Sequence, residues 1–468
     1  MFSKLAFSAA AVMTGIEAAD TAAWKSRAVY QILTDRFARD DTANAAACSN
    51  LSNYCGGTWK GIQNHLDYVQ GLGFDAIWIT PVVDNLDGGY HGYWARNWEK
   101  LNSNFGSEDD LKNLVKAAHS KGIWVMVDVV ANHVAPVGDD FSQIYPFNKA
   151  EHYHSDCQIQ DWSNQAQVEN CRLADLPDLN QDNQYVRDYL KNWVKDLVQT
   201  YDFDGIRIDT IPEVHNTFWK EFGDAAGVFQ MGENFNGDSN YVGPYQNYVT
   251  GLFNYPMYFT IKDVWGSGKS MYGIKNRFAE ESSKFKDLYA LGLFVDNHDN
   301  ARFLNQFQDT TMFKGALTFA LTGRGIPFYY YGSEQAYAGG NDPNNRESLW
   351  QDMNTDSDIY KMTAAINKAR KTMKSYDHPV EERYVQDDFY CFQRGKFLVA
   401  VNNIHNDQTI TVPNTAFDNG EQVCNIFYPT TDCQTVQDKS VKVFLKNGES
   451  KIYVPKASLV DDTFMAIQ

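Results

Sequence analysis

Four apolar segments of the chain each end in polar side chains that include carboxylates. These groups are Asp128-Val-Val-Ala-Asn-His133, Arg207-Ile-Asp209, Gly232-Glu-Asn234 and Asp296-Asn-His-Asp299. Cleavage of a glycosidic bond with retention of configuration needs one carboxylate as nucleophile and one carboxylic acid as proton donor, about 5 Å apart. Asp209 and Glu233 could supply that pair, and Asp299 could stabilise the positive charge that develops on the sugar ring. A single aspartate in such a position is more often a capping or solvated charge, but four groups favour one shared site.

Three further side chains in these groups suit supporting roles. His133, Arg207 and His298 could orient sugar hydroxyls at the same site. Arg207 could also keep Asp209 ionised, because a neighbouring positive charge favours the carboxylate.

A metal site is a weaker prediction. Asn132, Glu169 and Asp178 offer oxygen atoms of the kind that a hard cation such as calcium takes as ligands. From spacing alone, these residues are better interpreted as surface polar residues of a loop.

The elements that must position these groups follow an alternating order. From residue 28 onward, short apolar runs alternate with helical patterns, which is typical of a parallel sheet built from β–α units. The spacing predicts strands at 29–34, 74–80, 123–130, 205–209, 228–231, 291–296 and 326–331, with a poorly marked one at 253–259. Eight strands would close an α/β fold of the (β/α)8 barrel type, in which the chemistry lies at the C-terminal ends of the strands.

Two helices between these strands are well marked. Ser107 and Asp110 form a capping box, after which apolar residues recur at helical spacing until Gly122. A second helix has a predicted buried stripe, formed by Val186, Tyr189, Leu190, Trp193, Val194 and Leu197.

The chain of 468 residues is long enough for more than one domain. A polar stretch of about 50 residues follows the third predicted strand and is too long for an ordinary connection. Beyond residue 380 the pattern changes to short alternating strands. The predicted divisions are a signal peptide at 1–19, a barrel at 20–133 and 183–379, an inserted domain at 134–182 and a C-terminal β-sandwich at 380–468.

Composition narrows the class of partner. The formal net charge of −18 argues against nucleic acid and anionic membranes, whose phosphates would be repelled, and a neutral ligand fits better. The apolar start with its small residues Ala18 and Ala19 is typical of a secretory signal peptide, and elsewhere no apolar run reaches the ~20 residues that span a bilayer. We therefore expect a secreted, extracellular, soluble protein, with nothing to indicate an oligomer.

Seven cysteines in an exported chain indicate disulfides. Six of them fall into short-range pairs, which are Cys48 with Cys55, Cys157 with Cys171, and Cys424 with Cys433. Cys391 remains, in an apolar run that predicts a buried thiol. Asn50-Leu-Ser52 is a glycosylation sequon beside Cys48.

At the four carboxylate groups the sequence closely resembles glycoside hydrolase family 13, the alpha-amylase family, and its fungal-type secreted members in particular. The matching segments are Asp128 to His133, Gly205-Ile-Arg-Ile-Asp-Thr210, Gly232-Glu233, Phe294-Val-Asp-Asn-His-Asp299 and Leu176-Pro-Asp-Leu-Asn180. Further similarity lies in Tyr30 to Phe37, Cys55 to Trp59, Gly89-Tyr-His-Gly-Tyr-Trp94 and Gly339 to Arg346. The resemblance covers nearly the whole mature chain.

This resemblance implies a calcium-dependent enzyme that hydrolyses internal α-1,4 bonds of starch, glycogen and maltooligosaccharides. Asp209 would be the nucleophile, Glu233 the general acid and base, and Asp299 the transition-state stabiliser. Sugar-binding residues would be His91, Tyr93, Trp94, His133, Arg207, His298, Asp342 and Arg346. A structural calcium ion between barrel and inserted domain would be bound by Asn132, Glu169, Asp178 and the backbone carbonyl of Glu213. Without the motif, Tyr93 and Trp94 would be interpreted as ordinary core residues.

Two positions depart from the family pattern. Pro212-Glu213 stands where many members have Lys-His, and Asn234 follows the acid where fungal members usually have an apolar residue. Both changes bear on the side of the cleft that takes the leaving group, so a transglycosylase or an alpha-glucosidase on the same barrel stays an alternative. A non-catalytic starch-binding protein is disfavoured, because all three catalytic carboxylates are present.

Overall fold

The computed structural model describes residues 20–41 and 46–459; the predicted signal peptide at 1–19 lies outside them. Eight parallel strands form a closed barrel in the order β1-β10-β9-β8-β7-β6-β5-β2. They are β1 (Val29–Ile32), β2 (Ala76–Ile79), β5 (Trp124–Val129), β6 (Gly205–Ile208), β7 (Phe229–Gly232), β8 (Gly251–Phe253), β9 (Leu291–Leu293) and β10 (Ile326–Tyr330). The barrel fold that the sequence predicts is therefore confirmed, with most strands slightly shorter than expected.

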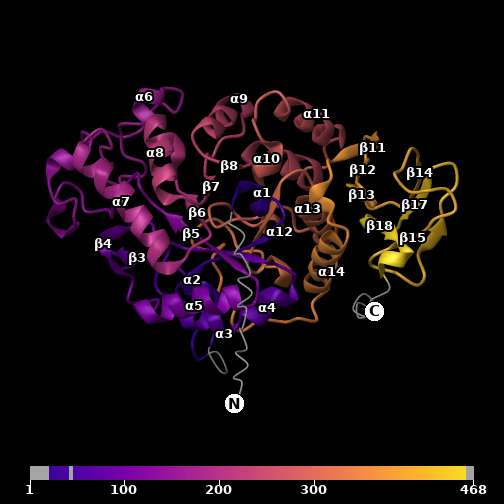
Figure 1. The fold of residues 1–468 in the computed structure, drawn as a ribbon, viewed down its shortest axis with the longest axis horizontal. Helices are drawn as coiled ribbons and strands as arrows, with labels where there is room; N and C mark the ends of the chain where they lie inside the picture. Colours follow the sequence, from indigo (N-terminus) through magenta and orange to yellow (C-terminus); the bar gives the residue numbers. More distant parts are fainter. Residues whose placement is uncertain (1–19, 42–45, 460–468) are drawn as a thin grey trace, which may run out of the picture.

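Helices surround the barrel, as Figure 1 shows. The longer ones are α5 (Glu108–Ser120), α7 (Gln184–Tyr201), α8 (Asn216–Ala226), α11 (Tyr272–Glu281), α13 (Thr310–Thr322) and α14 (Asp358–Thr372). Shorter ones are α1 (Thr21–Trp24), α2 (Thr34–Phe37), α3 (Trp59–Asn64), α4 (Leu66–Gly71), α6 (Gln165–Val168), α9 (Ser239–Val242), α10 (Tyr255–Ile261) and α12 (Phe303–Phe307). The capping box of Ser107 and Asp110 opens α5 as predicted.

The poorly marked strand that was predicted at 253–259 lies elsewhere. The strand β8 ends at Phe253, and most of the expected run forms the helix α10 instead. Asn254 caps that helix by accepting a hydrogen bond from the Met257 amide, and Pro256 lies in its first turn. Because nearly every side chain of this stretch is buried, the sequence shows no helical period that would distinguish helix from strand.

The buried stripe of α7 is also narrower than predicted. Val186, Leu190, Val194 and Leu197 are buried as expected. Tyr189 and Trp193 lie at the edge of the stripe and are only half-buried.

Two segments that follow barrel strands complete the region around the barrel mouth. The hairpin of β3 (Val83–Asn85) and β4 (Ala95–Leu101) follows β2, and its loop carries His91, Tyr93 and Trp94. The polar stretch after β5 is joined to the barrel segment by bridges, including His133 with Asp178, and contains the Cys157–Cys171 disulfide. Both segments stand beside the C-terminal ends of the barrel strands, where a site is expected.

The C-terminal part is all-β, as predicted, and lies at one end of the molecule in Figure 1. Its strands are β11 (Glu381–Gln386), β12 (Phe389–Arg394), β13 (Phe397–Asn402), β14 (Gln408–Val412), β15 (Gln422–Asn425), β16 (Cys433–Thr435), β17 (Val441–Leu445) and β18 (Lys451–Pro455). Six form an antiparallel sheet, and β14 pairs with β17 in a second sheet. On β12, Phe392 belongs to the core shared with the barrel, whereas Phe389 and Cys391 face the second sheet.

The cysteines pair as their spacing predicts. Disulfides join Cys48 to Cys55, Cys157 to Cys171 and Cys424 to Cys433. Cys391 is a buried free thiol whose pKa is raised by burial, so it is protonated and inert. No helix among the described ranges is both long and apolar enough to cross a membrane.

Candidate active site

One guanidinium group joins the carboxylates at the barrel mouth. Nη1 of Arg207 lies 2.7 Å from Oδ1 of Asp209 and 3.0 Å from Oδ1 of Asp128. Its Nη2 lies 2.8 Å from Oε2 of Glu233. Asp209 and Glu233 follow β6 and β7 by one residue each, so the parallel pairing of these strands brings both carboxylates to the same cation. The arrangement provides the closely spaced pair that retaining glycosidases need.

The pKa values of the two carboxyl groups are shifted in opposite directions. Burial would raise the pKa of Asp209, but the charge of Arg207, together with that of His133 when its ring is protonated, outweighs burial, and the pKa lies below its usual value. For Glu233 burial dominates over the opposing charge of Arg207, and Asp209 adds to the rise, so its pKa lies well above the usual value. One group is therefore held as a carboxylate and the other as an acid, which are the two protonation states that the chemistry requires.

Thr210 fixes the two carboxyl groups relative to each other. Its backbone amide donates to Oε2 of Glu233 at 3.1 Å, and its Oγ1 donates to Oδ2 of Asp209 at 3.1 Å. The residue adopts a left-handed conformation, with φ of 47°. A β-branched residue is strained there, and such strain of ~1–3 kcal/mol persists only where the surroundings impose it.

A chain of hydrogen bonds orients His298, which lies beside the third carboxylate, Asp299. Gln31 donates its amide to Nδ1 of His298 at 2.8 Å, which leaves the proton of the ring on Nε2. That atom meets the hydroxyl of Tyr93 at 2.8 Å, and the hydroxyl in turn donates to Asp128 at 2.7 Å. Burial, with Arg207 and Arg346 nearby, holds the pKa of His298 well below its usual value, so the ring is neutral.

Asp299 is held more loosely than the other two acids. Its carboxylate lies 3.4 Å from Nε2 of His298 and 3.8 Å from Nη2 of Arg346. Although 30% of its side chain is exposed to the cleft, loss of surrounding water raises its pKa, against the charge of Arg346.

These residues line a cavity of about 570 Å³ at the barrel mouth. Among the sequence-predicted residues in its wall are His91, Tyr93, Trp94, His133, Asp209, Glu233, His298, Asp299, Asp342 and Arg346. Arg207 is 1% exposed and lies beneath the carboxylates instead, with its guanidinium taken up by ion pairs. Its geometry therefore fits control of charge better than direct contact with a sugar.

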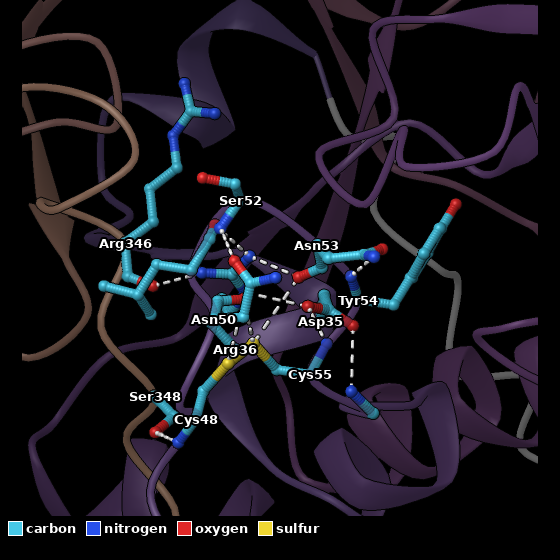
Figure 2. Close-up of a disulfide and its surroundings, with 12 residues drawn as sticks. Asp35, Arg36, Cys48, Asn50, Ser52, Asn53, Tyr54, Cys55, Arg346 and Ser348 are labelled. Atoms are coloured by element: carbon cyan, nitrogen blue, oxygen red, sulfur yellow. Dashed lines mark hydrogen bonds and ion pairs between the residues drawn. A yellow bond between two sulfur atoms is a disulfide. The ribbon is translucent and has the colours of Figure 1, made fainter.

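A buried network supports the loop that carries Arg346. Arg36 donates from Nη1 to the Arg346 carbonyl at 2.6 Å and from Nη2 to the carbonyls of Leu51 and Asn53. Figure 2 shows this arginine beside the Cys48–Cys55 disulfide, whose loop also reaches Ser348 through the Cys48 amide. The disulfide loop thereby holds the Arg346 segment in place from behind, while Arg346 itself pairs with Asp342 at 2.9 Å.

Three of the predicted calcium ligands converge. The side-chain oxygen of Asn132 lies 3.1 Å from the Glu213 carbonyl oxygen and 3.0 Å from Oδ1 of Asp178. Three oxygens without a proton to share suit a cation bound between them, whereas a rotated amide would let nitrogen donate to the other two. The residues therefore fit calcium.

The fourth predicted ligand, Glu169, is connected to the same segment. Its Oε1 accepts from Nε2 of Gln165 at 2.9 Å, and that amide also donates to the Pro212 carbonyl at 2.9 Å. Within 20–41 and 46–459 no three His, Cys, Asp or Glu side chains cluster as a metal site. The predicted calcium ligands do not form such a cluster because two of them are an amide side chain and a backbone carbonyl.

Several residues of the cleft could not be identified from the sequence. Trp162, Phe235 and Tyr241 line the cavity, and Trp162 is 59% exposed. Trp162 and Phe235 belong to loops and Tyr241 to the four-residue helix α9, and such short segments carry no periodic signal. Glu213 and Asn234, the two departures from the family pattern, also line the cavity.

Comparison with known proteins gives a consistent result. Residues 31–381 match the family model described as the alpha amylase catalytic domain. The alpha-amylase of Saccharomycopsis fibuligera is 38% identical over 92% of both chains, and alpha-amylase 1 of Schwanniomyces occidentalis is 38% identical over 93% of this chain and 90% of its own. The structure of an alpha-amylase from Malbranchea cinnamomea, 35% identical, superposes with a TM-score of 0.90 over 94% of this chain and 98% of its own.

Proposed function

The chain belongs to the alpha-amylase family, whose members are retaining glycoside hydrolases, and it has alpha-amylase function; on this premise we propose that Asp209, Glu233 and Asp299 catalyse hydrolysis of internal α-1,4 bonds in starch and glycogen. The observation that carries the assignment is the shared guanidinium of Arg207. It bonds to both Asp209 and Glu233, whose pKa values are shifted in opposite directions.

The first half of the reaction forms a covalent intermediate. A carboxylate oxygen of Asp209 attacks the anomeric carbon while Glu233 gives its proton to the glycosidic oxygen. The bond between that carbon and that oxygen breaks, and the leaving chain departs with a free hydroxyl.

The second half restores the enzyme. Glu233, now a carboxylate, takes a proton from water, and the water oxygen attacks the anomeric carbon. The bond to Asp209 breaks, and the configuration at the anomeric carbon is the same as in the substrate.

The remaining cleft residues stabilise charge and orient the sugar. Asp299, with its exposed carboxylate, faces the developing positive charge of the ring. His298 is neutral with its proton on Nε2, and it can donate to a sugar hydroxyl in place of Tyr93. His91 and Tyr93, whose rings lie 5.7 Å apart at 17°, form a stacking surface for a sugar ring.

Calcium binding is a further part of this proposal. Asn132, Asp178 and the carbonyl of Glu213 would hold the ion, with Glu169 beside them. When bound, calcium supplies a multivalent positive charge that fixes oxygen ligands in place. Because Asn132 also bonds to His133 at 3.2 Å, the residues that hold the ion orient one wall of the cleft.

Secretion is proposed as the setting for this activity. The three disulfides and the secretory pattern of residues 1–19 support an oxidising, extracellular location. The domain limits at 134–182 and 380–468 are likewise proposals, supported by the inserted segment after β5 and by the all-β part after α14.

Transfer of the glycosyl group to another sugar is a second candidate activity, favoured by two cleft residues. Oε2 of Glu213 and both polar atoms of Asn234 are buried and form no hydrogen bond with any of the described residues. Buried polar groups gain free energy from a hydrogen-bonding partner. An acceptor sugar offers more hydroxyl groups than water does. These two positions therefore affect whether water or a sugar accepts the glycosyl group.

The test is a time course of products from soluble starch and from maltotriose, with calcium and then with a chelator. Rapid loss of iodine-staining polymer, with mixed short maltooligosaccharides and weakening on chelation, is the expected result for a calcium-dependent endo-amylase. Products longer than the supplied maltotriose would make transglycosylation the main activity. Release of glucose alone from chain ends would contradict the proposal.

A further inference from the structure

A second ring-lined groove lies on the outside of the barrel, between β4 and α7. We call it the β4–α7 groove, and its volume is about 380 Å³. Its wall is formed by Val83, Trp98, Glu99, Lys100, Leu101, Tyr189, Asn192, Trp193, Asp196, Leu197, Thr200 and Tyr201. It shares no lining residue with the catalytic cleft. In Figure 1, the hairpin of β3 and β4 lies beside α7 at one side of the barrel.

Aromatic rings form one side of this groove. Tyr189, Trp193 and Tyr201 are half-buried, so each presents part of a ring at the surface. Tyr185, one turn before Tyr189, is 50% exposed, and the two rings lie 6.3 Å apart. The positions 185, 189 and 193 repeat every four residues, which places them on one face of α7 along about 12 Å.

Hydrogen-bonding side chains lie between and opposite these rings, three of them on α7 and Glu99 on β4. Glu99, Asn192, Asp196 and Thr200 are exposed and alternate with the rings. Trp98 is only 4% exposed, and its indole nitrogen makes no hydrogen bond with any residue that the structure describes.

The chemistry of this wall selects its ligand. Phosphate-bearing partners are disfavoured by the net charge of −18 and by Glu99 and Asp196 in the groove. A protein partner would favour a continuous apolar patch, whereas here rings and polar groups alternate. Flat rings interleaved with amides, hydroxyls and carboxylates match a neutral sugar chain, whose rings have apolar faces and hydroxylated edges.

We propose that the β4–α7 groove is a second binding site for α-glucan chains, separate from the catalytic cleft. The proposal rests on the amylase function, because that function makes a long neutral glucan the natural ligand. A chain held at this surface is kept close to the cleft, which raises the effective concentration of further chain segments there. The groove therefore affects polymeric and granular substrates and leaves short soluble ones unaffected.

The test measures binding to starch granules in the absence of hydrolysis. In a Glu233→Gln background, Tyr189→Ala and Trp193→Ala are combined, and the matched control is Tyr272→Ala, an aromatic residue on α11 that is 41% exposed. Loss of two stacking rings is expected to weaken adsorption to granules, and retardation in amylose-containing gels, about tenfold. The control should bind as the parent does.

Two measurements keep the result interpretable. Melting temperatures show whether the variants fold, and Tyr189→Leu, which keeps apolar bulk but loses the ring, replaces the double variant if that one is unstable. With Glu233 restored, maltotriose hydrolysis should be unchanged by the groove substitutions. Unchanged granule adsorption in a folded double variant overturns the proposal. Absence of hydrolysis in the protein that retains Glu233 would instead contradict the proposed function, and granule binding would still report on the groove.

Discussion

Arg207 explains how two similar acids in one cleft take opposite roles. Its guanidinium bonds to Asp209 at 2.7 Å and to Glu233 at 2.8 Å, so the cation lowers the pKa of both. Asp209 also lies 4.0 Å from Nε2 of His133, which lowers its pKa further when that ring is protonated, whereas Glu233 faces the negative charges of Asp209 and Asp299. The difference between the two acids therefore comes from their other neighbours.

Removal of the proton donor provides the most direct check. Glu233→Gln keeps the shape of the side chain but cannot donate its proton, so kcat on soluble starch should fall at least ~100-fold. The matched control is Glu221→Gln, a surface residue of α8 that pairs with Arg187 at 2.8 Å. Full hydrolysis with retention in the Glu233 variant would refute its assigned role.

The pH dependence of kcat/KM follows from the same two groups. Activity requires Asp209 ionised and Glu233 protonated, so it rises as Asp209 loses its proton and falls as Glu233 does. The pKa of Asp209 lies below its usual value and that of Glu233 above, which gives a broad active range. Arg207→Met removes the cation that lowers both pKa values, so both limbs should move to higher pH.

Arg207→Lys is the conservative comparison for that shift. It keeps the charge but not the planar fork, so the limbs should move less than in Arg207→Met. Limbs that stay fixed in both variants would contradict the assignment of charge control to this residue.

Among the elements, the inserted segment after β5 should be stabilised by calcium, which would join it to the barrel. A ligand that binds the folded state at 100 times its Kd stabilises that state by about 2.7 kcal/mol. We expect calcium to raise the melting temperature and a chelator to lower it. Asp178→Asn should remove most of this response, whereas Asp139→Asn, an exposed partner of Arg172, should keep it. A response that survives in Asp178→Asn would place the ion elsewhere.

The elements also show what the sequence could and could not predict. Strands such as β5 and β6 are short apolar runs that end in charged residues, so both the strand and its active-site residue are visible in the sequence. The run at 253–259 is buried on nearly every side, and there the period that separates helix from strand is lost.

Loop residues of the cleft show the other limit. Trp162 reaches the cavity only because the segment after β5 folds back over the barrel, and Gln31 acts through its bond to His298 across 267 residues of chain. Contacts of this kind depend on tertiary structure. Tyr189 and Trp193 follow the correct period on α7, but the period cannot tell whether the edge of a stripe is covered.

In the molecule as a whole, the C-terminal sheet shares its core with the barrel. Phe392 on β12 packs against Phe319 of α13 with their rings 6.1 Å apart, and Trp265 donates to the Asn402 carbonyl at 2.9 Å. Arg394, 2% exposed, donates to the Gly323 carbonyl at 2.7 Å. The apolar surface that the barrel domain presents here is therefore buried by the C-terminal sheet.

Truncation after residue 379 should accordingly harm the barrel itself. It would expose Phe319 and the other apolar residues of α13, and large exposed apolar patches promote aggregation. We expect the shortened chain to be insoluble or to melt well below the chain that keeps the C-terminal part, as measured by soluble yield and calorimetry. A soluble, fully active product would show that the two parts are independent.

At Thr210 the backbone conformation that favours activity lowers the stability of the fold. Its left-handed backbone is unfavourable for a β-branched residue, yet the same conformation directs its amide to Glu233 and its hydroxyl to Asp209. Asn accepts this conformation more readily and would relieve part of the strain. Selection for heat resistance alone should therefore favour Thr210→Asn with a higher melting temperature, and selection that also requires starch hydrolysis should retain threonine. This position would then mark where evolution has kept a less stable protein because it is a better catalyst.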